Sequence, residues 1–398
     1  MGMLINTKRK TALVLLALSV LAPFLSGCWD STEVNDLAVI TTVGLDLTED
    51  HQLELSVKIY LTSPAASQPS GGGMSEPGGG NSGKSVVRWA KGVDMADAAS
   101  KLQQVITRKV FWGQAEVFIF GERLAQEGLA EPMDYLIRHP TPRERANVFV
   151  SESTAKEVLL LDPPIERSVA DALREMAKSQ TGLDITMKEL AQMMAGKSKA
   201  AVIPIVKIKP EQEGQEPFVF VQGTAILKNG KMVGRMNDDV TRGVMWLRNE
   251  VKRATVTVTP KNTQGYVSVQ MLRNRARLFP QIQGDKWSIT VQIEAKDEII
   301  QNTTDLDLSV PKHLEQVEKA LEDDINHRMN MALAQAQKKM KADIFQFADE
   351  FYRKYPKEWS KNKDRWDEIF PNVDVRLETN VKIARPGLTG KNPFKGQR

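Results

Sequence analysis

Alternating apolar and polar positions predict paired strands near the start of the chain. Residues 37–43 are apolar and β-branched, and after a polar turn Leu53, Leu55, Val57 and Ile59 recur at every second position. Period-two alternation rich in Val, Ile and Thr is typical of strands. Further strands are expected at 85–89, 116–120 and 147–150, with helices at 94–106, 124–137 and two or three more up to Gly196. Strands that alternate with helices indicate a mixed sheet covered by helices.

Two of these helices carry more specific expectations. In the helix at 94–106, Ala98, Leu102 and Val105 share one face, which we expect to be buried. In the helix at 124–137, Pro132 should kink or split the helix, because proline lacks an amide N–H and clashes with the preceding turn.

The rest of the chain predicts two more αβ units. In the second, Asn229-Gly230 separates two strand-like runs, and this dipeptide is the strongest short-range hairpin signal. The third has alternating strands at 267–272 and 287–293, a helical stretch at 311–352 and a last strand pattern at 373–383. That stretch would span about 63 Å if unbroken. We therefore expect an α+β protein with three mixed αβ domains, at 28–200, 216–260 and 263–398, and a long helix in the C-terminal domain.

Residues 63–84 interrupt the first unit with a change of composition. Seven of these 22 residues are Gly, five are Ser and three are Pro. Such a segment buries too little apolar surface to offset its ordering entropy, so it predicts a flexible loop. Residues 78–85 within it match the phosphate-binding pattern G-x-x-x-x-G-K-[ST]. That pattern needs a strand before it and a helix after it, and neither is predicted, so we interpret the match as chance.

The N-terminal 27 residues predict a lipoprotein signal peptide. Lys8-Arg9-Lys10 precede an apolar run from Ala12 to Leu25, which is too short to span a bilayer but suits a signal sequence. The run ends in Leu25-Ser26-Gly27-Cys28, which resembles a bacterial lipobox. Cys28 is the single cysteine of the chain and the predicted lipid attachment site, an acylation of the protein rather than a cofactor. An ordinary secretory signal with a chance cysteine is the alternative.

Charge and motif content argue against nucleic acid and against an enzyme. The chain of 398 residues carries a net charge of +4, and the predicted leader contributes three of those positive charges. A nearly neutral mature chain gives no electrostatic basis for nucleic-acid binding. The four histidines are far apart, with no spacing typical of a metal site, and a hydrolase nucleophile motif is absent. Carboxylate pairs such as Asp238-Asp239 and Asp323-Asp324 are interpreted as solvated helix residues or a helix cap. We expect no catalytic residues, metal or cofactor.

Aromatic residues near the C-terminus suggest a packed cluster. Trp359, Trp366 and Phe370 share a face if their stretch is helical. Core packing is favoured over a partner surface. Four basic residues lie beside or between them and could contact anionic headgroups, although a solvated face is the simpler interpretation. These are Lys357, Lys361, Lys363 and Arg365.

Short motifs occur along the whole mature chain. Near the start these are Cys28-Trp29-Asp30, Glu33, Asn35-Asp36, Ala38 and Gly44-Leu45-Asp46. They continue with Phe111-Trp112-Gly113, Tyr135-Leu136-Ile137-Arg138 and Gly223-Thr224-Ala225-Ile226. The densest part is Asp343-Ile344-Phe345, Phe351, Pro356, Trp359, Trp366, Phe370, Val381-Lys382-Ile383 and Gly387. As a set, these motifs resemble the Ger(x)C family, the lipoprotein C subunits of spore germinant receptors. Gln114 departs from a His that is frequent in this family, and Gln346-Phe347-Ala348 replaces a more Gly-rich stretch.

The resemblance implies a function that the motifs themselves do not. A family member would be a three-domain αβ lipoprotein on the outer face of the spore inner membrane. It would work with receptor A and B subunits in assembly or signal coupling, without enzymatic activity. The main alternative is an exported solute-binding lipoprotein that captures the nutrient, which would need two lobes around a polar pocket. A cell-wall hydrolase would need a catalytic constellation that the sequence does not display.

Overall fold

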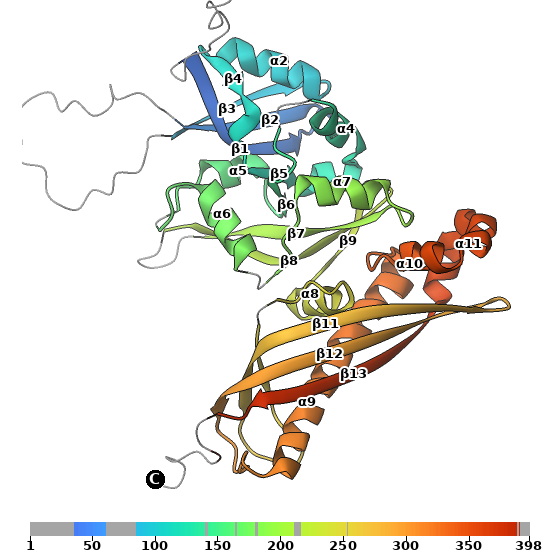
Figure 1. Ribbon diagram of the computed structural model, residues 1–398. Coiled ribbons are helices and arrows are strands. Elements are labelled where there is room, and N and C mark those ends of the chain that lie inside the picture. The colour runs from blue at the N-terminus through green and yellow to red at the C-terminus, as the bar shows by residue number, and fades with distance from the viewer. Residues whose placement is uncertain are drawn as a thin grey trace, which may run out of the picture.

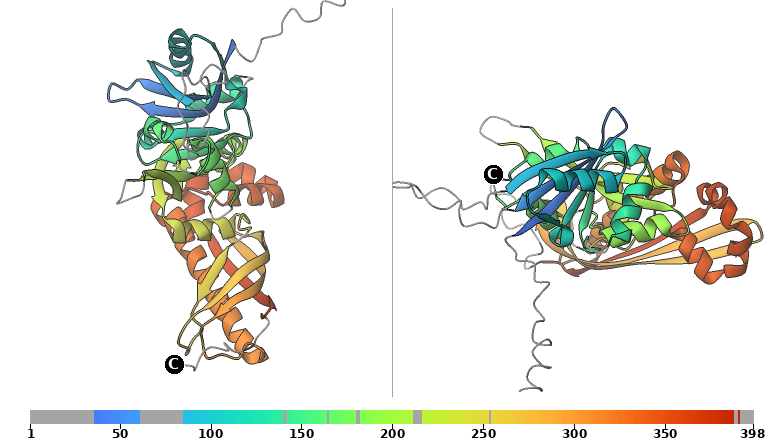
Figure 2. Two further views of the ribbon diagram at one scale, coloured as in Figure 1. Left: turned by 90° about the vertical axis from the view of Figure 1, so that its left-hand side faces the viewer. Right: turned by 90° about the horizontal axis from the view of Figure 1, so that it is seen from above.

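The computed structural model describes most of the chain downstream of the predicted leader. Its described residues are 36–60, 85–139, 142–163, 165–179, 182–210, 216–252, 254–387 and Gly390. The predicted leader, Cys28 and the predicted loop at 63–84 lie outside them, as does all of the phosphate-loop match except Ser85. Within the described residues, the strands form one sheet of nine and one of four. The two sheets lie one beyond the other along the long axis of the molecule (Figures 1 and 2).

The nine-stranded sheet confirms the predicted mixed topology. Its order is β3-β2-β1-β5-β6-β7-β8-β9, and β4 pairs with the start of β1. Strands β1, β5, β6 and β7 are parallel, while β2, β3, β8 and β9 are added antiparallel. The bounds are β1 (Leu37–Leu47), β2 (Leu53–Tyr60), β3 (Ser85–Gly92), β4 (Lys109–Phe111), β5 (Val117–Gly121), β6 (Asn147–Ser151), β7 (Ala200–Lys209), β8 (Phe218–Lys228) and β9 (Lys231–Met236).

Helices cover both faces of this sheet. Alternate residues of β5 point to opposite faces, as the pleat requires: Val117 and Ile119 pack against α5 (Ala155–Leu160) and α6 (Val169–Lys178). Phe118 and Phe120 belong to the core on the other face. That face is covered by α2 (Met95–Val105), α3 (Glu122–Glu127), α4 (Ala130–Arg138) and α7 (Met187–Ala195). Because both faces are covered, the central strands β5 and β7 read as nearly continuous apolar runs.

Two local predictions can be compared with the helices. Ala98 and Leu102 are buried as expected, but Val105 is exposed, because α2 ends there and Ile106 turns into an extended conformation. The predicted split near Pro132 is confirmed, since α3 ends at Gly128 and Pro132 occupies the first turn of α4. Gly128 has a φ of 145°, a conformation that side-chain-bearing residues rarely adopt.

Residues 216–260 do not form a unit of their own, contrary to the expected middle domain. The predicted Asn229-Gly230 hairpin is present, but its strands β8 and β9 extend the large sheet by pairing with β7. Helix α8 (Asp238–Leu247) packs on α9 (Pro311–Leu333), and β10 (Thr255–Val258) joins the small sheet. Strand β7, which is not among those expected from the sequence, pairs antiparallel with β8 and so brings the hairpin into the large sheet. The first unit therefore continues through Met236, and the third begins at β10.

The four-stranded sheet has the order β10-β11-β12-β13, with β13 parallel to β12. Strands β11 (Val267–Gln283) and β12 (Lys286–Asn302) are far longer than predicted, and β13 is Asp374–Arg385. Helix α9 lies along one face of this sheet (Figure 1). The remaining helical elements gather near the free end of the β11–β12 hairpin. They are η5 (Ala334–Met340), α10 (Phe347–Lys354), α11 (Pro356–Asn362), η6 (Lys363–Arg365), α12 (Trp366–Ile369) and η7 (Phe370–Asn372).

The helical stretch predicted at 311–352 is broken. Leu321 and Ile325 are buried on α9, but the helix continues into the π-helical turn η5 and ends at Lys341, which has a φ of 49°. A second left-handed residue, Gln346, precedes α10. Between them, the carboxylate of Asp343 accepts hydrogen bonds from backbone amides, so the chain turns instead of continuing the helix.

The predicted aromatic cluster is confirmed as core. Trp359, Trp366 and Phe370 are each no more than 4% exposed. The Trp366 ring centroid lies 5.2 Å from that of Trp359 and 6.0 Å from that of Phe370. Trp287 of β12 and Phe351 of α10 complete the cluster. Tilted aromatic contacts of this kind fasten the short C-terminal helices to the hairpin.

We expect Gly243→Ala to destabilise the protein by about 2 kcal/mol or more. A Cβ at Gly243 in α8 would lie 2.1 Å from the carbonyl oxygen of Arg328 in α9, so the two helices would have to separate. Alanine has the higher helix propensity, so any loss reports packing. The measurement is the free energy of unfolding by denaturant titration. Gly182→Ala is the matched control, because a Cβ there has no heavy atom within 4 Å. Equal effects at both positions would contradict the close helix contact.

A second expectation concerns Asp297, which is 2% exposed on β12 and whose Oδ1 has no hydrogen-bond partner among the described residues. Burial raises its pKa from 3.8 to about 7. Between those values the folded state retains a proton that the unfolded state has released, so this group makes stability fall as pH rises from about 4 to 7. Asp297→Asn should flatten that part of the profile and raise the free energy of unfolding at pH 8, on the order of 1.4 kcal/mol per pKa unit.

The comparison requires urea titrations of both proteins between pH 4 and 8. Glu294→Gln, on the exposed face of the same strand, should leave the profile unchanged. A pH profile of Asp297→Asn that parallels the wild type would show that this carboxyl does not titrate abnormally.

Candidate functional site at the N-terminal edge of the large sheet

The predicted lipid attachment residue can be related to the fold by chain length. Cys28 lies outside the described residues, and the chain becomes described at Asp36, directly before β1. Eight residues of sequence separate Cys28 from Asp36, so the start of β1 is the described strand end nearest to it along the chain. At this edge the parallel strands β1, β5 and β6 begin, and a polar network gathers there.

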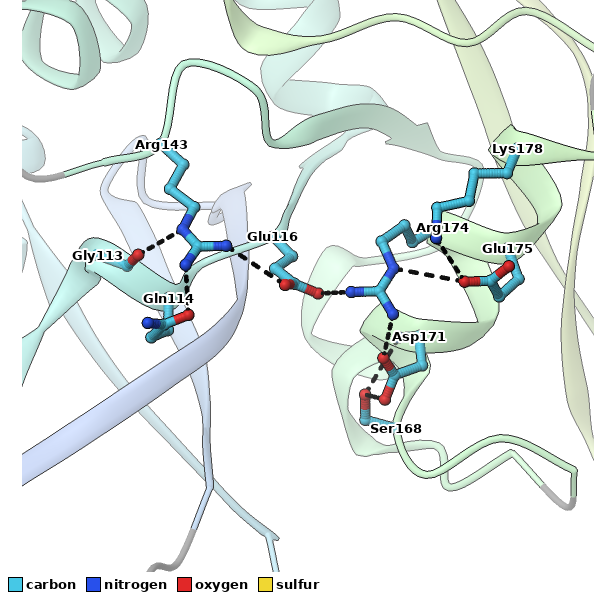
Figure 3. Close-up of polar contacts among 9 residues, drawn as sticks. All are labelled: Gly113, Gln114, Glu116, Arg143, Ser168, Asp171, Arg174, Glu175 and Lys178. Atoms are coloured by element: carbon cyan, nitrogen blue, oxygen red, sulfur yellow. Dashed lines mark hydrogen bonds and ion pairs between the residues drawn. The ribbon is translucent and has the colours of Figure 1, made fainter.

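Glu116 is the centre of this network (Figure 3). Its backbone joins two strands, because its N–H donates to Thr41 and its carbonyl accepts from Asn147. Its carboxylate lies between two guanidinium groups. Arg143 Nη1 is 3.4 Å from Oε1, and Arg174 Nη1 donates to Oε2. The carboxylate therefore links the loop at 142–146 to helix α6 across the edge of the sheet.

Each arginine is also held by groups on its own side. Arg143 Nε donates to the Gly113 carbonyl at 2.6 Å, and Arg174 Nη2 donates to Asp171 at 2.8 Å. The hydroxyl of Ser168 begins α6 by accepting from the Asp171 N–H. Figure 3 shows the two arginines approaching Glu116 from opposite directions. With about 30% of the Glu116 and Arg174 side chains exposed, the network is partly screened by water.

We call this network of Glu116, Arg143 and Arg174 the clasp, because it links separate segments of the fold. Its carboxylate accepts from two cations, and no histidine takes part in the contacts drawn. No group of three or more His, Cys, Asp or Glu side chains within the described part of the chain could hold a metal ion. Gln114, which departs from the frequent family His, accepts from Arg143 Nη2 at 2.5 Å. The Gln114 amide oxygen thus accepts a hydrogen bond from the Arg143 guanidinium of the clasp.

Gly44 and Asp46, from one motif of the resemblance, serve the packing of α5. A Cβ on Gly44 would touch Ala155 at 3.1 Å, so glycine permits the helix to lie close to β1. The Asp46 carboxylate accepts from the amides of Ala155 and Lys156 at the start of that helix. Burial raises the pKa of Asp46 to about 6, although both amide hydrogen bonds act to lower it. This motif therefore joins a helix to the sheet.

Asp343 has the same role at α10. It is buried, and its oxygens accept from the amides of Phe345, Phe347 and Ala348 and from Trp366 Nε1. Burial raises its pKa to about 6, against the opposing effect of these donors. Phe347 and Ala348, within the Gln346-Phe347-Ala348 departure, thus supply two of the three amide donors of this turn.

The remaining polar candidates from the sequence have structural partners. Asp238 accepts from the Gly223 amide, and Asp239 pairs with Arg328 of α9. Asp324 also pairs with Arg328, and Asp323 with lysines at the surface. Within the described residues, no helix combines the length and apolar character needed to cross a membrane.

Glu116→Gln should lower the free energy of unfolding by about 1–2 kcal/mol. The substitution removes the charge between two guanidinium groups but keeps the side-chain shape, and hydrogen bonds to charged groups contribute about this much. Glu368→Gln is the matched control, since its ion pair with Arg365 leaves both side chains more than 60% exposed. Denaturant titration of both variants measures the difference. A loss for Glu116→Gln no larger than that for Glu368→Gln would argue against the clasp.

Two family models match the chain and together span most of the described structure. The spore germination protein N-terminal domain matches residues 30–208. The model described as spore germination B3/GerAC like, C-terminal, matches residues 222–387. The boundary between them falls in the β7–β8 region, where the large sheet is continuous.

Proteins of similar length and one solved structure agree with these matches. Spore germination protein KC of Bacillus subtilis is 28% identical over 404 residues, covering 96% of this chain and 97% of that protein. The putative spore germination protein YfkR of the same organism is also 28% identical, covering 92% and 94%. The crystal structure of the GerBC protein has a TM-score of 0.55 at 18% identity, covers 86% of this chain and 96% of that chain, and shows the same fold. The chain belongs to the Ger(x)C family of spore germination proteins.

Proposed function

We propose that this chain is a non-enzymatic, lipid-anchored subunit of a nutrient germinant receptor, needed for assembly or signal coupling. The observation that carries the proposal is that the two spore germination models cover both sheets of the fold. Relatives named as spore germination proteins align over nearly their whole length. The proposed partners are the receptor A and B subunits and the membrane, at the outer face of the spore inner membrane.

The position of Cys28 supports an anchored arrangement. Acylation there would tether the start of β1 to the lipid surface through eight residues of sequence. A lipid anchor confines a protein to two dimensions and so raises its effective concentration near membrane partners. The clasp around Glu116 lies at the same edge of the sheet, because Glu116 bonds to Thr41 of β1. It would stiffen the part of the domain that is tethered.

The polar chemistry of the described residues is directed at structure. Asp46 and Asp343, two carboxyl groups with pKa values raised by burial, accept from backbone amides that begin helices. Glu116 lies between two arginines. Side chains engaged in this way support a role in holding and coupling partners rather than in acid–base catalysis.

The solute-binding alternative receives little support from the architecture. A solute-binding protein of that class closes two similar lobes around a polar pocket. Here a nine-stranded sheet with helices on both faces adjoins a four-stranded sheet with a long hairpin. Calorimetry of the purified protein against candidate nutrients is the discriminating test, since tight binding would favour direct nutrient capture.

Cys28→Ala should release the protein from spore membranes and reduce the nutrient response, because the thiol that accepts the lipid is removed. The measurement is the share of protein in the membrane fraction, by immunoblot, together with germination in nutrients. Thr32→Ala, four residues away, is the matched control and should behave as wild type. Full membrane retention of Cys28→Ala would overturn the anchor.

Deletion of the gene tests the receptor role separately. Spores lacking it should lose the response to one set of nutrients and keep the response to a trigger that bypasses the receptors. Failure under both triggers would instead place the protein in cortex breakdown.

A further inference from the structure

A cleft of about 780 Å³ opens between the N-terminus of α2 and one face of α4. Its apolar lining includes Leu47, Leu53 and Leu124. Successive helix positions of α4 line one side, among them Glu131, Asp134, Tyr135 and Arg138. A volume of this size suits a ligand or a short peptide segment.

The polar lining of the cleft is mainly acidic. Asp94, Glu127, Glu131 and Asp134 contribute carboxylates, whereas Arg138 is the one Lys or Arg among the lining residues. Arg138 is already paired with Asp134 at 2.6 Å. No ion pair is present at the other three carboxylates among the described residues. Asp94 accepts from the Asp97 amide as the N-cap of α2, so Glu127 and Glu131 carry the negative charge that no side chain of the cleft neutralises.

The carboxylates are spread around the cleft and do not converge. They come from the turn before α2, from the end of α3 and from two turns of α4. No three acidic or histidine side chains of the described residues approach closely enough to hold one metal ion. Several cations along a chain segment fit this spacing better than a single compact cation.

Exposed apolar residues accompany the acidic groups. Val93, which lines the cleft, is 78% exposed, and Ile137 of α4 is 59% exposed. In Tyr135-Leu136-Ile137-Arg138, a stretch that contributes to the family resemblance, Leu136 alone is buried in the core. Partial burial and the charge of Asp94 raise the pKa of Tyr135, which keeps its hydroxyl protonated as a hydrogen-bond donor. Contacts within this chain thus account for Leu136, for Arg138 through Asp134 and in part for Tyr135, whereas Ile137 is exposed.

The chain's own termini do not lead to this cleft. The cleft adjoins Leu47, at the end of β1, about 33 Å along the strand from the residue where the described chain begins. Residues 61–84 carry one Lys and one Glu, so this stretch of the sequence lacks the several cations that the acidic cleft would pair with. Gly390 lies by Asp307, toward the opposite end of the molecule (Figure 1). The occupant would accordingly be another chain.

We propose that this acidic cleft docks a segment of another receptor protein that carries Lys or Arg residues next to aliphatic ones. The aliphatic side chains would cover the Leu-lined floor, and the cations would meet the uncompensated carboxylates at the rim. The choice of a receptor protein as the partner rests on the proposed function. The assignment of the cleft as a docking site rests only on its geometry and charge.

A photo-crosslinking amino acid placed at Val93 in full-length protein in spores tests the proposal. Irradiation should produce an adduct whose partner peptide, sequenced by mass spectrometry, contains Lys or Arg beside aliphatic residues. Ile165 is the matched control site, because it is 91% exposed and lies before α6, on the other face of the sheet. Adducts of equal yield and composition from both sites would overturn the proposal.

Charge reversal then tests the electrostatic part. Glu127→Lys with Glu131→Lys should lower the Val93 adduct yield about tenfold or more, because like charges would face each other. Asp285→Lys with Glu368→Lys, two exposed acids away from the cleft, should leave it unchanged. Immunoblotting of spore membranes verifies that each variant is present in equal amount. An unchanged yield after cleft reversal would overturn the proposal.

The partner's identity separates the remaining outcomes. Cross-linking to a second copy of this chain would assign the cleft to self-association and overturn docking of a different protein. If the cross-link to a basic segment depends on charge but deletion of the gene leaves the nutrient response intact, the docking site holds and the receptor function is refuted. If deletion abolishes the nutrient response but no adduct forms at Val93, the receptor function holds and the docking site is refuted.

Discussion

The close contact between α8 and α9 is the constraint that joins the two halves of this molecule. Gly243 brings α8 against the backbone of α9 at Arg328, and Arg328 in turn pairs with Asp239 of α8 and Asp324 of its own helix. On the other side of α8, Thr241 hydrogen bonds to Thr224 of β8, the strand that extends the large sheet. One continuous apolar core consequently runs from the large sheet to the small one. Motion of one sheet against the other would have to open this core.

Buried carboxylates organise the elements around that join. Asp46 and Asp343 each satisfy amide groups at the start of a helix that packs on a sheet or hairpin. A buried carboxylate is costly unless it is hydrogen bonded, so each is tied to one local geometry. This explains why several short motifs of the family resemblance coincide with turns and helix starts. The carboxylates in these motifs stabilise the fold.

Surface features divide between the two ends of β1. The clasp around Glu116 lies where the chain enters the domain, while the acidic cleft lies where β1 ends. An anchor before β1 and a docking cleft beyond it would place lipid and protein partners on separate sides of one rigid sheet. Such an arrangement suits a subunit that couples other components, because displacement at one end is transmitted through paired strands.

The local pattern of the sequence was sufficient for most strands of the large sheet, for the Asn229-Gly230 hairpin and for the burial of Trp359, Trp366 and Phe370. Those features depend on side-chain periodicity and turn chemistry, which neighbouring residues determine. Tertiary structure alone decided that β8 and β9 belong to the large sheet, and that the stretch at 311–352 breaks where Asp343 captures amides. It also decided that Glu116 meets Arg143 and Arg174, which are 27 and 58 residues away in the chain. Contacts between such distant segments depend on how the sheets close, and single positions carry no periodic signal of their partners.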